Sequence, residues 1–149
     1  MAVWPVYVEE WQQRCCGEEF VVGDRVSWRL RLEPDWSGFE AVEVDLGDGG
    51  DDEAHVGGLH ARWEGPGRSR RGVLVEEHHD RPAASTATEG VVRRVRIVRR
   101  SFAWSERHGA MAPTTDPIRL QPVDGPAATP YDDEITGWIV DLETPRVEG

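Results

Sequence analysis

Two clusters of thiol and imidazole side chains are the residues of this chain best suited to chemistry. The first is the adjacent pair Cys15 and Cys16, and the second is the run His78, His79 and Asp80. Thiolate and imidazole are the ligands with which proteins hold zinc or iron. Adjacent side chains diverge, however, so one pair rarely brings both members to a single ion. A metal site made from Cys15, Cys16, His78 and His79 would therefore need a further ligand. The remaining histidines could supply it: His55, His60 and His108.

The same residues allow two hypotheses of thiol chemistry. A cysteine nucleophile with a histidine base has the right residue types, and Gly17 would help a turn to offer backbone N–H groups to an oxyanion. The pair Cys15 and Cys16 would also suit redox sensing. The common enzyme signatures (a glycine-rich phosphate loop, Gly-x-Ser-x-Gly and His-Glu-x-x-His) are absent from the sequence. We therefore assign no catalytic residue and expect a protein without catalytic activity.

Cysteine usage and hydropathy predict the compartment. Adjacent cysteines can bridge only through a strained ring, so we expect no structural disulfide. A reducing cytoplasm is then the simplest setting. The apolar runs are too short for a membrane-spanning helix, and no basic start leads into an apolar segment as in a secretory signal.

The charge of the chain is strongly negative and unevenly spread. The formal net charge is −11, and all 17 basic residues are arginine. The acidic glycine-rich loop 45–53 has carboxylates that would suit calcium, but its spacing fails the EF-hand register, so we expect a solvated loop. A net negative charge repels nucleic acid at long range.

A cationic strand nevertheless makes single-stranded nucleic acid a third hypothesis. Its arginines would be Arg94, Arg96 and Arg100, with the stacking platforms Trp36, Trp63 and Trp104. The simpler expectation is that these arginines pair with an acidic strand across the sheet.

Alternation of apolar and polar residues predicts an all-β fold. The clearest strands are 25–32 and 91–102, where every second residue is largely apolar. Gly and Pro interrupt the chain too often for long helices. Six to eight short strands at regular spacing favour a small antiparallel β-barrel, OB-like or SH3-like. Further strands are expected over 4–8, 41–46, 56–63, 73–77, 118–123 and 135–142.

The predicted organisation is one β-barrel-like domain over 1–103, followed by a Pro-rich acidic extension over 104–149. Most of 106–134 is expected to be linker, and one further strand is expected within the extension at 135–142. The residues expected in the core are Trp11, Phe20, Val26, Trp28, Leu30, Val44, Trp63, Val73, Val75, Val95 and Ile97.

Three segments carry a resemblance to a known family. They are WQQRCCGEEFVVGDRVSW at 11–28, GVLVEEHHD at 72–80 and GVVRRVRIVRRSF at 90–102. Together they resemble a family of small actinobacterial proteins that carries a domain-of-unknown-function label. The resemblance covers roughly residues 3–103 and implies no activity.

The sequence as a whole predicts a cytoplasmic interaction module. We expect a protein or small-molecule ligand to meet the surface near Cys15, Cys16, His78, His79 and Asp80. The alternative is a metal-binding protein that uses zinc or iron, with an enzyme as one form of it. Neither a membrane nor nucleic acid is the expected partner.

Overall fold

The computed structural model describes residues 2–34, 38–45, 52–63, 69–77 and 83–145. This part of the chain is mostly β-structure with one α-helix, so the expected all-β class is confirmed at that level. The strands and helices in chain order are β1 (Ala2–Glu9), α1 (Glu10–Cys16), β2 (Arg25–Trp28), β3 (Leu30–Pro34), β4 (Val42–Asp45), β5 (Glu53–Val56), β6 (Leu59–Trp63), β7 (Ser69–Glu76), β8 (Thr88–Arg99), β9 (Phe102–Ser105), β10 (Ala110–Pro113), β11 (Arg119–Val123), a 3-10 turn (Pro126–Ala128) and β12 (Ile135–Thr144).

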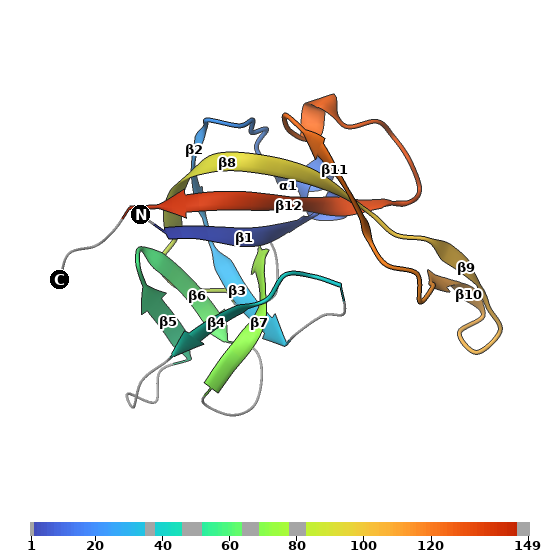
Figure 1. Cartoon of the computed structure of the whole chain (residues 1–149), viewed down its shortest axis with the longest axis horizontal. Helices are drawn as coiled ribbons and strands as arrows, with labels where there is room; N and C mark the ends of the chain where they lie inside the picture. The colour runs from blue at the N-terminus through green and yellow to red at the C-terminus, as the bar shows by residue number, and fades with distance from the viewer. Residues whose placement is uncertain (1, 35–37, 46–51, 64–68, 78–82, 146–149) are drawn as a thin grey trace.

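Ten of these strands form one curled sheet that resembles a half-barrel (Figure 1). The main path runs β11-β8-β12-β1-β7-β3-β6-β5, while β2 pairs with β8 and β4 pairs with β7. The pairings are mostly antiparallel, but β1 lies parallel to β7 and β3 lies parallel to β6. Among the described strands, β11 and β5 end the path and do not pair with each other, so these pairings do not close the sheet into a barrel.

The C-terminal strand lies in the middle of the sheet. β12 pairs with β1 on one side and β8 on the other, and its Trp138 is fully buried. The strand expected over 135–142 therefore forms and extends to Thr144. Residues expected to be a C-terminal extension supply a central element of the same core as residues 2–103.

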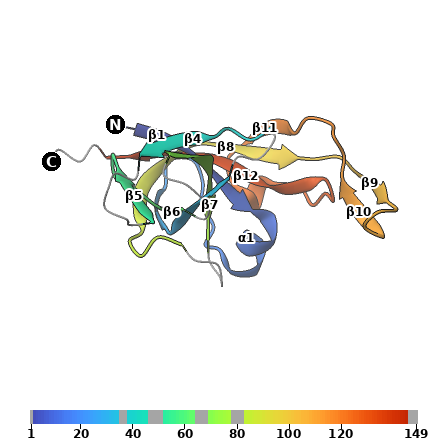
Figure 2. The same ribbon diagram turned by 90° about the horizontal axis from the view of Figure 1, so that it is seen from below.

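The segment 106–134, expected to be mostly linker, contains β10 and β11. β9 and β10 form a separate hairpin that projects from one end of the molecule (Figures 1 and 2). β11 then returns to pair with β8. β11 confirms the strand expected over 118–123, whereas alternation is weak in β9 and β10 because most of their side chains are exposed, so the sequence pattern does not reveal this hairpin.

Apolar side chains pack on both faces of the sheet. The larger cluster includes Leu30, Leu74 and Trp138, and the smaller one includes Tyr7 and Val75. Most residues expected in the core are buried, Val26 is half-buried, and Trp11 is 56% exposed, so its expected burial is wrong. Trp11 lies on α1, where an alternating strand pattern gives no guide to burial.

The helix α1 is the main local departure from the expected strands. Glu, Gln and Arg are good helix formers, and the ion pair between Glu10 and Arg14, four residues apart, supports the turn. The strand expected over 25–32 is divided at Arg29 into β2 and β3, which pair with different neighbours. No helix of the described residues is long and apolar enough to cross a membrane.

Candidate functional site

Cys15 and Cys16 form the last turn of α1, and both side chains are exposed. The structure joins them in a disulfide. The expectation that these adjacent cysteines are unbridged is therefore wrong for this structure. Both sulfurs lie at the exposed end of a short helix, where solvent surrounds them, and the adjacent positions keep them within bonding reach.

The disulfide changes what the two cysteines can do. A thiolate is the form that attacks an electrophile or binds a metal, and a disulfide sulfur carries no such charge. Both the metal-ligand role and the nucleophile role of Cys15 and Cys16 therefore require reduction first. Within the described ranges, no three His, Cys, Asp or Glu side chains lie close enough to hold a metal ion.

The second predicted cluster, His78, His79 and Asp80, lies outside the described residues. The residue before this cluster, Glu77, is described. It is buried, and its backbone N–H donates to the carbonyl of Arg29 at 3.0 Å. The position of these three side chains relative to Cys15 and Cys16 therefore stays a prediction.

The sheet brings the starting points of the two clusters to one end. β1 runs parallel to β7, with Val6 beside Leu74 and Tyr7 beside Val75. β1 leads directly into α1, and β7 leads directly to Glu77. Because parallel strands end on the same side of a sheet, the start of α1 and Glu77 both lie at this end.

A buried guanidinium connects these starting points. Arg31 on β3 is 1% exposed and forms ion pairs with Glu9, Glu33 and Glu77. Its Nη2 lies 3.2 Å from the carboxylate of Glu9, and its Nε lies 2.7 Å from that of Glu33. Glu9 precedes α1 and Glu77 precedes His78, so one side chain fixes the start of both predicted segments. We call Arg31, Glu9, Glu33 and Glu77 the Arg31 cluster.

Burial perturbs two titratable groups beside this cluster. Desolvation raises the pKa of Glu76 to about 8, and the nearby charge of Arg31 opposes that rise. Desolvation also raises the pKa of Tyr7 to about 12, against the effect of its hydrogen bond with Thr136. Glu76 is therefore largely protonated at neutral pH, which limits the excess of negative charge beside Arg31.

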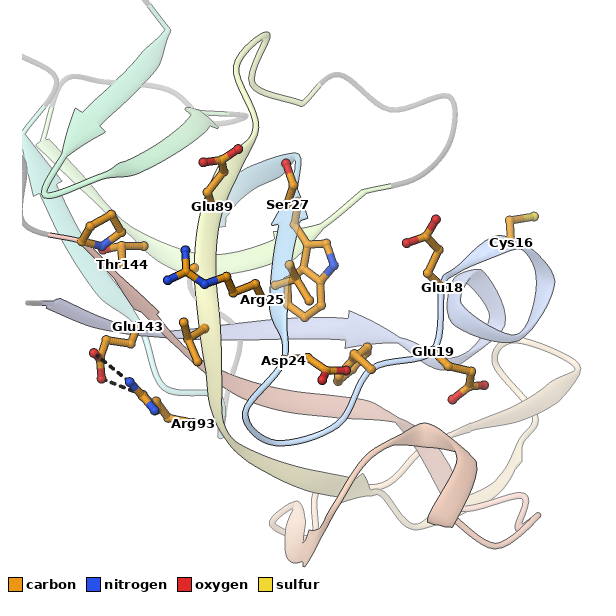
Figure 3. Close-up of a pocket in the computed structure, with 16 residues that line it drawn as sticks. Cys16, Glu18, Glu19, Asp24, Arg25, Ser27, Glu89, Arg93, Glu143 and Thr144 are labelled. Carbon is orange, nitrogen blue, oxygen red and sulfur yellow. Dashed lines mark hydrogen bonds and ion pairs between the residues drawn. The ribbon is translucent and has the colours of Figure 1, made fainter.

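A groove with an acidic lining lies on the other side of α1 (Figure 3). It encloses about 910 Å³ between the segment 16–28, the start of β8 and the end of β12. Cys16 is the member of the predicted binding residues that lines it. The charged residues of its lining are Glu18, Glu19, Asp24, Arg25, Glu89, Arg93 and Glu143.

Carboxylates outnumber guanidinium groups in this groove. Arg93 donates two hydrogen bonds to Glu143, at 2.9 and 3.2 Å, drawn as dashed lines in Figure 3. These bonds lower the pKa of the Glu143 carboxyl and raise that of Arg93, so both groups hold their charges. The rings of Phe20 and Trp28 pack edge to face, with their centroids 5.1 Å apart, and form an apolar floor. The groove therefore suits a cationic ligand that also has apolar surface.

The arginines of β8 mainly serve the sheet. Arg94 and Arg96 both form ion pairs with Asp141 on β12, at 2.8 and 3.0 Å. This confirms the expected pairing of the cationic strand with an acidic one. Arg100 follows β8, and its backbone N–H donates to the carbonyl of Glu134. The charges expected to attract nucleic acid are thus partly neutralised by β12.

The auxiliary histidines and tryptophans occupy separate places. His55 and His60 face each other across β5 and β6 with their Nδ1 atoms 2.6 Å apart. Desolvation, followed by the charge of His55, lowers the pKa of His60. His108 is exposed in the turn between β9 and β10, and Trp104 on β9 is 64% exposed. Trp63 is buried on β6, and Trp36 lies outside the described residues.

Comparison with known proteins identifies the family. A model of a family of unknown function, DUF6578, matches residues 2–144. The chain belongs to this family. The match begins with β1 and ends with β12, so the DUF6578 unit includes the C-terminal strand and is longer than the 3–103 expected from the resemblance. No curated protein and no solved structure matches the chain.

Sequence reasoning missed the Arg31 cluster. Arg31 alternates with Leu30 and Leu32, which predicts a solvent-facing side chain. The structure buries it because the opposite face of β3 is also covered, and three carboxylates receive its charge. The consecutive pair Glu76 and Glu77 at the end of an apolar strand is the signal that could have indicated a buried basic partner.

Proposed function

We propose that this DUF6578 protein is a non-catalytic binding module that takes a cationic ligand in the groove beside Cys16. The observation that carries the proposal is the lining of that groove, in which carboxylates surround an aromatic floor. Pockets of several hundred Å³ with an apolar floor and a few oriented polar groups are typical ligand sites. The net charge of −11 would also steer a basic partner toward the protein.

The test measures binding of a blocked peptide of alternating arginine and valine by fluorescence anisotropy. We expect the wild-type protein to bind this peptide and not the matching peptide of alternating glutamate and valine. Added salt should weaken binding because the attraction is electrostatic. Glu89→Arg, in the groove, should reduce the affinity about tenfold.

The matched control is Glu106→Arg, which changes the net charge equally. Glu106 is exposed in the turn between β9 and β10 and does not line the groove. An equal loss of peptide affinity in the two variants would mean that only the overall charge affects binding. The groove would then not be the binding site. Absence of binding to both the alternating peptide and a flexible peptide of arginine and glycine would remove the proposal.

A second candidate function is metal binding by the reduced protein. The parallel pairing of β1 and β7 favours it, since the segments that contain Cys15, Cys16, His78 and His79 start at one end of the sheet. Zinc or iron is the metal that this donor set would suit.

Elemental analysis tests this candidate on protein purified without a histidine tag, reduced and kept free of oxygen. One metal per chain, lost in Cys15→Ser and in His79→Ala, would support it. Metal far below one per chain in the reduced wild-type protein would exclude it. Alkylation before and after reduction reports the state of the cysteines, and we expect both to react only after reduction.

A further inference from the structure

We propose that the ligand of the groove is an extended basic segment of another protein, which adds to the free edge of β2 as a new strand. This inference rests on the proposed function and specifies its ligand. The groove is lined by every residue from Asp24 to Trp28. Successive side chains of a strand point to opposite faces. A groove that reaches all of these residues therefore runs along the edge of the strand.

Within the described residues, one edge of β2 is open for pairing. All four residues of β2 pair with β8, from Arg25 beside Val91 to Trp28 beside Thr88. Among the described strands, β8 is the neighbour of β2, and none lies against its other edge. An edge of this kind presents backbone N–H and C=O groups that a further strand can pair with.

The chain before β2 forms the opposite wall of the groove. After α1 it passes through Glu18 and Glu19 and reverses at a turn in which the N–H of Asp24 donates to the carbonyl of Val21 at 3.0 Å. The side chain of Asp24 closes the same turn by accepting from the N–H of Val21. Figure 3 shows this wall with Cys16 and Glu18 on one side and β2 on the other. The space between the two walls can therefore accept a strand.

The carboxylates that line the groove favour a basic ligand. Glu18, Glu19 and Asp24 line the wall and the turn, and Glu89 lies beside Ser27 in the ladder of β2 and β8. A basic segment with alternating side chains would place its cations against these carboxylates and its apolar residues toward Trp28. A second copy of this chain would instead bring a further Asp24 and a net charge of −11 to the same edge. Complementarity thus favours a basic partner over a homodimer.

The experiment uses amide hydrogen exchange of the full chain, followed by NMR, with the blocked arginine–valine peptide as probe. Strand addition should slow exchange at alternate amides within Arg25–Trp28, those that point away from β8. Two peptide variants follow, one N-methylated at every arginine and one at every valine. Only one set of amides faces β2, so one variant should lose at least about tenfold in affinity and the other should bind like the parent.

The outcomes separate this inference from the proposed function. If the parent peptide binds and both methylated variants bind equally well, strand addition is wrong and the cationic groove stands. If the flexible arginine–glycine peptide binds and the alternating peptide does not, strand addition is again overturned. If neither peptide binds, the proposed function falls as well. Protection of the same β2 amides in the free protein, together with a dimeric mass in sedimentation, would replace the basic partner by a second copy.

Discussion

Arg31 carries its charge almost wholly out of solvent, so the carboxylates around it decide whether the fold tolerates it. Removing one partner from a buried ion pair leaves an uncompensated charge and is strongly destabilising. The cluster shares this charge among Glu9, Glu33 and Glu77, which belong to or follow three different strands. It therefore aligns β1, β3 and the end of β7 as well as neutralising the guanidinium.

Glu76 gives a pH-dependent prediction at the same place. Its pKa is raised from 4.5 to about 8, so between these values the folded state binds a proton that the unfolded state has lost. Glu76 therefore makes the free energy of unfolding fall as the pH rises from 4.5 to 8. Glu76→Gln keeps the shape of the side chain but cannot ionise. Its free energy of unfolding at pH 8 should therefore exceed that of the wild-type protein by about 1 kcal/mol or more.

Urea unfolding of the two proteins across this pH range measures the effect. We expect the difference between Glu76→Gln and wild type to grow with pH and to be smallest at the acid end. A difference that does not change with pH would show that Glu76 ionises normally in the folded protein. Glu106→Gln, on the exposed turn after β9, is the control, and it should not change the pH dependence.

The Arg31 cluster also marks the limit of prediction at the residue scale. Strand alternation correctly places Leu30 and Leu32 in the core, since it follows from backbone geometry alone. It cannot show whether the second face of β3 is covered, because that depends on residues distant in sequence such as Glu9 and Glu77. For β8, Arg94 and Arg96 keep partial access to solvent and pair with Asp141, as the charge pattern predicted.

Close pairing of β7 with its neighbours makes Gly72 important at the scale of elements. Gly72 lies beside Pro34 of β3 and Val42 of β4. A Cβ built on it would lie 1.9 Å from the carbonyl oxygen of Glu33, a backbone atom that cannot move without opening the ladder. The absence of a side chain at this position therefore lets three strands meet.

Gly72→Ala should lower the free energy of unfolding by about 2 kcal/mol or more, since β3 and β7 must separate. The matched control is Gly109→Ala in the turn between β9 and β10. Gly109 has a positive φ of 61°, but nothing lies within 4 Å of an added Cβ, so about 1 kcal/mol of backbone strain is expected. Thermal unfolding compares the two, and equal losses would show that the β3–β7 contact adapts to the methyl group.

The parallel pairing of β1 and β7 is the feature that sequence reasoning could not supply. Alternation identifies strands, but it does not say which strands are neighbours or in which direction they run. The proposed neighbourhood of Cys15, Cys16, His78 and His79 came only from their unusual chemistry. The parallel register brings Glu9 and Glu77, which precede α1 and His78, to one end of the sheet, and the neighbourhood itself stays a prediction.

At the scale of the whole molecule, charge is organised more finely than the net value suggests. The basic residues of β8 are matched by acids of β12, while the groove keeps an excess of carboxylates. The expectation from composition that nucleic acid is not the partner stays a prediction. Composition could not show where the unmatched acids gather, because the groove joins residues 16–28 with 89–93 and 143–145.

The central position of β12 governs how the chain can assemble. β12 is the last of the described strands in chain order, and it lies between β1 and β8 in the sheet. During synthesis, β1 and β8 must wait in an incomplete sheet until residue 144 has left the ribosome, with apolar surfaces such as those of Val8 and Ile97 still unprotected. Contacts between such distant parts of a chain form slowly. Nascent chains stalled before Ile135 should therefore depend on chaperones, whereas chains that include Ile135–Thr144 can join β1 to β8 in one late step.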